Sequence, residues 1–156
     1  MTEHPAKVRW TLSGGDFLAK EYSRDHIVEF PNGTALDASA AASYGGSADK
    51  IDPEASFTGS LSSCHMLTFL ALCAVKGLEV EHYEDEATGY LDKNLEGRMA
   101  MTRIKLRPQA TFRGESPDEE QLVMLHERAH RACFISNSIK TAVDIEPRSA
   151  VRIPNP

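Results

Sequence analysis

Three cysteines carry the most distinctive chemistry in this chain, and two of them stand in settings typical of reactive thiols. Cys64 follows Ser62 and Ser63 in a long, nearly uncharged segment, and Cys133 closes a charged segment. Cys64 and Cys73 are nine residues apart, about 900° on a regular helix, so they face opposite sides of it and cannot pair. Cys133 is therefore the thiol that folding can bring to Cys64, and we expect a redox pair more than a structural bridge.

The composition indicates a globular protein of a reducing compartment. The 156 residues carry a formal net charge of −6, which argues against a nucleic-acid partner. The N-terminus lacks the apolar stretch of a secretory signal, and residues 55–75 contain too much serine and threonine to cross a bilayer. Cysteines without such a signal are typical of thiols that stay reduced. We therefore expect a cytoplasmic protein with no membrane partner.

Short strands and one long helix are expected to place Cys64. Alternating apolar and polar residues predict strands at 7–12, 27–30 and 35–38. Asp52-Pro53-Glu54 is a helix start, with Asp as the cap and Pro in the first turn. The helix should run to Lys76 and end at Gly77, and Gly59 predicts a bend or a close backbone approach.

The second half predicts strands around a second helix that ends at Cys133. Residues 78–91 predict a strand pair broken near Thr88-Gly89, and 102–112 a long strand with an edge or bulge at Pro108. Residues 116–119 predict a capping box with Pro117 at the first helical position, and 141–146 a last strand. One helical stripe should be buried: Leu122, Leu125, His126, Ala129, Ala132 and Cys133. This order predicts an α+β fold in a single domain over residues 1–156.

Two segments together resemble the OsmC and organic hydroperoxide resistance family. Members typically show Asn-Pro-Glu, ten residues from that Glu to a reactive Cys, and a second Cys in an Ala-His-x-x-Cys segment. Here Glu54 precedes Cys64 by ten residues, and Ala129-His130-Arg131-Ala132-Cys133 matches the second segment. The resemblance covers nearly the whole chain, from Val8 to Pro147. It implies an OsmC-like fold of antiparallel strands, a long central helix and a second helix, in an intertwined homodimer with both reactive sites at the interface.

The activity that the resemblance implies is a peroxidase that reduces organic hydroperoxides to alcohols. Cys64 would become a sulfenic acid, Cys133 would condense with it to a disulfide, and a dithiol would reduce that disulfide. In the organic hydroperoxide branch the dithiol is a dihydrolipoyl group, so a lipoyl-bearing protein is the expected partner. No metal or organic cofactor is expected. Many relatives place Pro after the second Cys, whereas Phe134 stands here.

A cation and a carboxylate should hold the Cys64 thiolate. Glu54 matches the family carboxylate, although on a straight helix it lies ~15 Å from Cys64, so a bend or a bridging arginine is needed. In many relatives the arginine follows a Gly-Gly pair, but Asp16 follows that pair here. Arg24 is the nearest alternative, or else a turn residue paired with Asp25. Lys50 and Arg9 remain further candidates.

Two alternatives compete with a peroxidase. His126-Glu127-Arg128-Ala129-His130 fits the H-E-x-x-H pattern of zinc peptidases, and Cys133 continues the same face, so a zinc hydrolase is conceivable. The other interpretation of both histidines is packing on the helix face. A non-enzymatic OsmC-like dimer that binds a hydrophobic ligand is the third hypothesis.

Four further residues belong to the neighbourhood of the expected site, and the sequence does not decide their roles. His65 follows Cys64 but points about 100° away from it on a helix, which favours a core or interface position. Tyr22, His26 and Tyr44 are candidates for the lining of a pocket.

Overall fold

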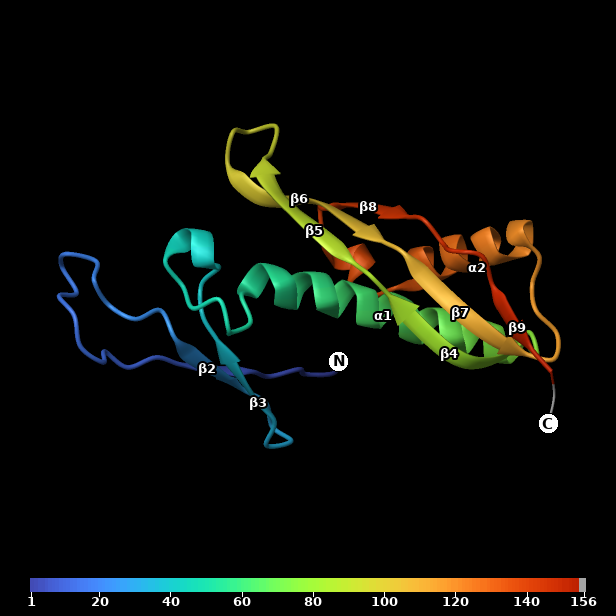
Figure 1. Ribbon diagram of the computed structural model, residues 1–156, viewed down its shortest axis with the longest axis horizontal. Helices are drawn as coiled ribbons and strands as arrows, with labels where there is room; N and C mark the ends of the chain where they lie inside the picture. Colours follow the sequence, from blue (N-terminus) through green and yellow to red (C-terminus); the bar gives the residue numbers. More distant parts are fainter. Residues whose placement is uncertain (155–156) are drawn as a thin grey trace. The chain divides into compact units, whose positions relative to one another are not determined.

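The structure is a computed structural model that describes residues 1–154. It has two α-helices, α1 (Pro53–Val75) and α2 (Glu119–Ala132), and two 3-10 turns, η1 (Ala42–Tyr44) and η2 (Ser136–Ser138). The strands are β1 (Lys7–Arg9), β2 (His26–Glu29), β3 (Ala35–Ala38), β4 (Glu79–Asp85), β5 (Thr88–Lys93), β6 (Met99–Leu106), β7 (Pro108–Arg113), β8 (Ala142–Ile145) and β9 (Val151–Ile153) (Figure 1). The α+β class predicted from the sequence is confirmed.

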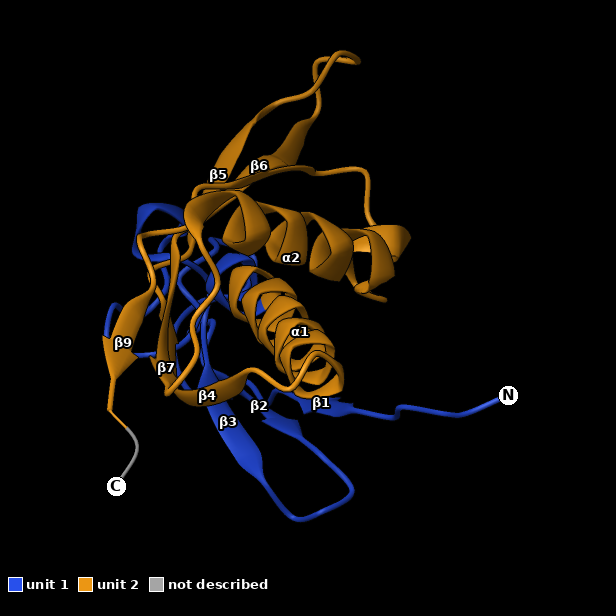
Figure 2. Ribbon diagram, turned by 90° about the vertical axis from the view of Figure 1, so that its right-hand side faces the viewer, with its two compact units in different colours: residues 1–56 blue, residues 57–156 orange. Residues whose placement is uncertain are grey.

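The chain forms two compact units, and the boundary falls after the first turn of α1. The first unit comprises Met1–Ser56 and the second begins at Phe57 (Figure 2). The helix nevertheless runs without interruption across this boundary. The single domain expected over residues 1–156 stays a prediction.

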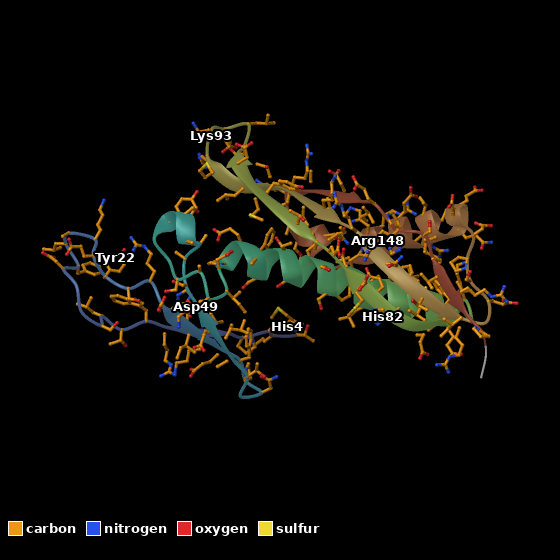
Figure 3. All side chains as sticks on the ribbon, viewed as in Figure 1. His4, Tyr22, Asp49, His82, Lys93 and Arg148 are labelled. Atoms are coloured by element: carbon orange, nitrogen blue, oxygen red, sulfur yellow. The ribbon has the colours of Figure 1, made fainter. Side chains whose placement is uncertain are left out.

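The first unit is an antiparallel sheet in the order β1-β2-β3. Val28 at its centre pairs with Val8 on one side and Leu36 on the other. The strand predicted over 7–12 is shorter than expected and ends at Arg9, because Trp10 leaves the ladder. Its ring packs against Tyr22, and its indole N–H donates a hydrogen bond to a backbone carbonyl of the long β1–β2 loop at 2.7 Å. Tyr22 lies on that loop (Figure 3).

The ends of α1 follow the predicted signals. The Asp52 carboxylate accepts the backbone N–H of Ala55 at 2.7 Å, and Gly77 ends the helix in the left-handed conformation with φ 73°. The close backbone approach expected at Gly59 is wrong: the helix continues through this residue, and a Cβ added there would meet nothing within 4 Å. By length and composition α1 would also suit a membrane span. It is instead the long core helix of the fold and buries Leu61, His65 and Phe69.

Two mixed sheets build the second unit. Their strand orders are β4-β7-β9 and β5-β6-β8, and the contacts of β9 and β8 are parallel. The strand pair predicted at 78–91 is therefore corrected, because β4 pairs with β7 and β5 with β6. The long strand predicted at 102–112 breaks at Arg107, whose backbone N–H turns to the Asp85 carboxylate at 2.6 Å. Pro108 is thus the first residue of a central strand, not an edge or bulge, and β9 is a strand that the sequence reading missed.

Helix α2 carries the predicted stripe but begins two residues later than expected. Asp118, not Ser116, is the N-cap, and its carboxylate and the Gln121 side chain form the capping box. Leu122, Leu125, His126 and Ala129 are buried, whereas Ala132 is exposed. Cys133 is the C-cap, so the end of α2 fixes the position of this thiol.

The core of the second unit has two clusters along α1. The first joins the C-terminal half of α1 to α2 and β7; its buried members are Phe69, Cys73, Ala110, Phe112, Leu122, Leu125 and Ala129. The second joins the N-terminal half of α1 to β6 and the end of α2; its buried members are Leu61, Ile104, Leu106 and Cys133. Cys64 packs at the margin of this second cluster.

Candidate active site

The structure brings Cys64 and Cys133 together, although 69 residues separate them in the sequence. The two sulfurs lie 2.8 Å apart, and both residues are free thiols. Cys64 projects from the middle of α1 and is partly exposed, whereas Cys133 at the end of α2 has an exposed fraction of 0%. The pair needs only small movements to reach the ~2 Å of a disulfide bond.

The two thiols differ in their acidity. Burial raises the pKa of the Cys64 thiol, and its hydrogen bond with Cys133 raises that pKa further. Burial opposes ionisation at Cys133 as well, but hydrogen bonds from Cys64 and from Ser136 outweigh it and lower the pKa of the Cys133 thiol. The second unit alone therefore favours the thiolate at Cys133, and ionisation of Cys64 needs a further positive charge.

The segment that follows Cys133 turns its backbone N–H groups toward both sulfurs. The N–H of Ser136 donates to the Cys133 sulfur at 3.5 Å. The N–H groups of Phe134 and Ile135 act on Cys64 and lower its thiol pKa, though by less than burial raises it. A proline at 134, as in many relatives, has no N–H to offer.

Sequence reasoning did not find Ser136. Its hydroxyl is buried, and no hydrogen bond to it is formed by the described residues in this thiol state. It lies four residues beyond the end of α2, at the start of η2, where no helical period predicts which way a side chain points. The available signal was its position three residues after Cys133.

Arg24 lies in the first unit, on the segment just before β2. Its guanidinium donates to the backbone carbonyls of Gly45 at 3.3 Å and Tyr22 at 3.4 Å, and it covers the Tyr22 ring at 5.0 Å. The alternative of a pair with Asp25 is wrong, because Asp25 accepts from Ser47 and lies 3.7 Å from Lys50.

Of the three candidate cations, Arg24 is the one without a carboxylate partner among residues 1–154. Arg9 pairs with Glu29, and Lys50 pairs with Asp25. Asp16, which stands where many relatives have the arginine, accepts the backbone N–H groups of Leu18 and Ala19 and closes a turn.

Glu54 occupies the first turn of α1 and is half-buried. A carboxylate there is favoured by the positive end of the helix dipole. Glu54 and Arg24 belong to the first unit, and Cys64 and Cys133 to the second. The roles predicted for Glu54 and Arg24 stay predictions.

An apolar cavity of about 520 Å³ opens in the first unit. Its aromatic wall comes from Trp10, Phe17 and Tyr22, and Arg24 and His26 supply its polar groups. Two of the three residues proposed from the sequence thus line a pocket, but Tyr44 is exposed and is not part of this lining.

His126 packs in the core of the second unit, as the packing interpretation predicted. Its ring stacks on Phe69 with centroids 4.2 Å apart, and its Nδ1 atom lies 3.0 Å from Nε2 of His65. Glu127 is exposed on the other side of α2. The residues that the structure describes contain no group of three His, Cys, Asp or Glu side chains that could hold a metal. The zinc-hydrolase alternative therefore has no ligand set in this part of the chain.

Comparison with known proteins agrees with this architecture. Residues 46–148 match the family model described as OsmC-like protein. An OsmC-like protein of unknown function from Vibrio cholerae is 40% identical and superposes with a TM-score of 0.89, covering 95% of this chain and 100% of that one. The uncharacterized protein YmaD of Bacillus subtilis is 22% identical over 111 residues, 69% of this chain and 73% of that protein.

Two solved structures of organic hydroperoxide resistance proteins share the fold. The protein from Legionella pneumophila is 20% identical, with a TM-score of 0.66 and 98% of both chains covered. OhrB of Bacillus subtilis is 21% identical, with a TM-score of 0.60, and the match covers 92% of this chain and 98% of that one. The family match, the 40% identical neighbour and the shared fold lead to one conclusion: the chain belongs to the OsmC family.

Proposed function

We propose that this protein is a cysteine-based peroxidase that reduces organic hydroperoxides to alcohols. The observation that carries the proposal is the 2.8 Å between the sulfurs of Cys64 and Cys133, two free thiols in reach of a disulfide. Cys73 has no such partner in the described residues, and burial raises the pKa of its thiol to about 11. The names of two structural neighbours agree with a peroxide-related role.

In the proposed reaction the Cys64 thiolate attacks the outer oxygen of the hydroperoxide. The O–O bond breaks, Cys64 becomes a sulfenic acid, and the alkoxide leaves and takes up a proton to give the alcohol. The Cys133 sulfur then attacks the sulfenic sulfur, and water leaves as the disulfide forms. A dithiol, such as a lipoyl-bearing protein, returns both cysteines to thiols.

The first step requires a cation near Cys64, because burial raises the pKa of that thiol. We assign this role to Arg24, whose charge has no carboxylate partner in the described chain, and assign Glu54 to orient it. Thiols that must stay reduced between turnovers suit the cytoplasm.

Thiol titration with cumene hydroperoxide tests the proposal. One equivalent should consume two thiols in the wild type. Cys64→Ser should consume none, whereas Cys133→Ser should consume one and give a sulfenic acid that dimedone traps. Cys73→Ala is the matched control and should behave as the wild type. Unchanged thiol loss in Cys64→Ser would end the proposal.

Arg24 can be tested with another arginine of the first unit, Arg9, as control. Arg24→Gln should slow oxidation of Cys64 by about tenfold or more, since one pKa unit is already a tenfold change in thiolate at neutral pH. Arg9→Gln should leave the rate unchanged, because Arg9 pairs with Glu29 on the surface. Equal rates of Cys64 oxidation in the two variants would show that Arg24 does not act on this thiol.

The apolar cavity favours the second candidate, a binding protein for an apolar molecule without peroxidase chemistry. Its lining is aromatic and aliphatic apart from Arg24 and His26. In that case both thiols should survive an excess of cumene hydroperoxide, while an apolar probe such as 1-anilinonaphthalene-8-sulfonate binds, and Trp10→Ala weakens binding. Rapid thiol loss would exclude it.

A further inference from the structure

A disulfide between Cys64 and Cys133 would have two unequal halves. The Cys133 side chain is completely buried, whereas Cys64 is partly exposed. In thiol–disulfide exchange an incoming thiolate bonds to one sulfur and the other sulfur leaves as a thiolate. Access from solvent therefore favours attack at Cys64, with Cys133 as the leaving group.

Ser136 offers two donors to the leaving sulfur. Its backbone N–H lies 3.5 Å from the Cys133 sulfur and already donates to it. Its hydroxyl is buried without a hydrogen bond from the described residues, although it is near enough to lower the pKa of the Cys133 thiol. A buried hydroxyl without a partner costs free energy. That cost disappears when an anionic sulfur beside the hydroxyl accepts a hydrogen bond from it.

Cys64 has a different set of neighbours. Its hydrogen bond with Cys133 raises the pKa of its thiol, and the groups that lower this pKa are the backbone N–H groups of Phe134 and Ile135. The donor set thus favours negative charge on Cys133 once the S–S bond breaks.

We propose that Ser136 is a positioning residue that stabilises Cys133 as the leaving thiolate, so that an external dithiol attacks Cys64. This rests on the proposed function, because it concerns the step that regenerates the enzyme. The external thiolate forms a bond to the Cys64 sulfur, the Cys64–Cys133 bond breaks, and its electron pair stays on Cys133. The second thiol of the reductant then attacks the mixed disulfide and releases Cys64. The dithiol loses two electrons and two protons, and both cysteines become thiols.

The site of attack can be mapped on the wild-type chain. Diamide forms the Cys64–Cys133 disulfide without any peroxide. The oxidised protein is treated briefly with 2-mercaptoethanol, quenched in acid, blocked with N-ethylmaleimide and digested with trypsin. Cleavage at Lys50, Lys76, Arg131 and Lys140 separates the two cysteines. We expect the mercaptoethanol adduct on Cys64, located by fragment ions, and maleimide on Cys133. An adduct mainly on Cys133, or equal adducts on both, would overturn the proposal.

Ser136 itself is tested by comparison with Ser138, a serine of the same turn that is exposed and donates to the Phe134 carbonyl. In a Cys64→Ser background, Ser136→Ala should raise the pKa of the Cys133 thiol, read from thiolate absorbance, by about one unit. In the otherwise wild-type chain it should slow reduction of the diamide-formed disulfide by dithiothreitol roughly threefold. Ser136→Thr, which keeps the hydroxyl, should restore both values, and Ser138→Ala should change neither. Equal values in Ser136→Ala and the wild type would refute the role.

These outcomes are distinct from those of the peroxidase test. If cumene hydroperoxide leaves the thiols intact while diamide still gives a disulfide that opens at Cys64, the proposed function fails and the direction of exchange stands. If peroxide forms the disulfide but Cys133 carries the adduct, the peroxidase stands and the role of Ser136 fails.

Discussion

At the scale of single residues, the cysteine pair is distinguished by the donors around it. Cys64 and Cys133 share one hydrogen bond, so a proton on one sulfur favours the anion on the other. The backbone after Cys133 then adds N–H groups without any charged side chain. Phe134 contributes one of them because it is not a proline.

Phe134→Pro tests that contribution. The substitution removes the N–H that acts on Cys64, so the pKa of the Cys64 thiol should rise, by roughly half a unit for one weak hydrogen bond. The preceding residue suits this change, since Cys133 has the extended conformation, with ψ 121°, that a residue before proline prefers. The pH dependence of alkylation by monobromobimane in a Cys133→Ser background gives the value. Phe134→Ala, which keeps the N–H, is the control, and an equal pKa in both variants would contradict the interpretation.

At the scale of elements, a buried histidine pair joins α1 to α2. Nδ1 of His65 is buried with no hydrogen-bond partner from the described residues, so a proton there would be an unpaired donor. His65 is therefore protonated at Nε2 and donates to Nδ1 of His126. Burial, with His130 nearby, lowers the pKa of His65 to about 4, and burial, with His65 nearby, lowers that of His126 to about 3.

This pair predicts a loss of stability in mild acid. The unfolded chain takes up protons at both histidines near pH 6.5, whereas the folded chain resists until about pH 4. The unfolded state therefore binds more protons between these values, and the free energy of unfolding should fall as pH drops from about 6.5 to 4. Urea unfolding across this range should show a smaller slope for His126→Leu than for the wild type. His82→Gln, at an exposed position of β4 (Figure 3), should keep the wild-type slope. Equal slopes in all three proteins would refute the prediction.

Gly89 and Gly59 differ in the space that a side chain would find at each position. A Cβ at Gly89 in β5 would lie 2.3 Å from Oγ1 of Thr58 and 2.4 Å from Cε of Met101. A close approach to a neighbouring element is therefore made at Gly89, not at Gly59.

Alanine at these two positions should have opposite effects on thermal unfolding. Gly89→Ala should destabilise by about 1–3 kcal/mol, as overpacking does. Gly59→Ala, with open space around its Cβ in a helix interior, should stabilise by roughly 0.5–1 kcal/mol. A stabilised Gly89→Ala variant would show that β5 and α1 are not in close contact there.

At the scale of the whole molecule, the single chain leaves apolar side chains on its surface. Leu67 and Val75 on α1 are 61% and 87% exposed, and Phe134 beside the cysteine pair is 82% exposed. A long helix with apolar residues on a second face is typical of an element that packs against another chain. These residues support the homodimer that the family resemblance implies, which stays a prediction.

Sedimentation velocity checks the dimer. The wild type should sediment as a dimer at micromolar concentration, and Leu67→Glu should weaken association at least tenfold, because a buried unpaired carboxylate costs several kcal/mol. Leu67→Met keeps the apolar contact and should remain dimeric. A monomeric wild type would reject the homodimer, and a dimeric Leu67→Glu would move the interface away from this face of α1.

The sequence by itself determined the features that depend on local signals: the ends of α1, the buried face of α2 and the family. The Asp52 cap and Gly77 stop predicted α1 to within one residue, and the 3.6-residue period of Leu122, Leu125, His126 and Ala129 predicted the buried face of α2. The resemblance carried by Glu54, Cys64 and the Ala129–Cys133 segment predicted the family, which the comparisons confirmed. These features depend on neighbours in the chain, so one sequence is enough to read them.

Only the tertiary structure decided which strands pair and what surrounds each sulfur. The partners of β4 and β5 lie in β7 and β6, and the Asp85 carboxylate that interrupts 102–112 comes from another strand. Likewise, the greater acidity of Cys133 depends on hydrogen bonds with Cys64 and with Ser136, which outweigh the effect of burial, and Ser136 lies where the helical period has already ended. Such properties arise from contacts between segments distant in the chain or irregular in backbone. Periodicity and capping rules carry no information about them, because both describe a residue only through its local backbone.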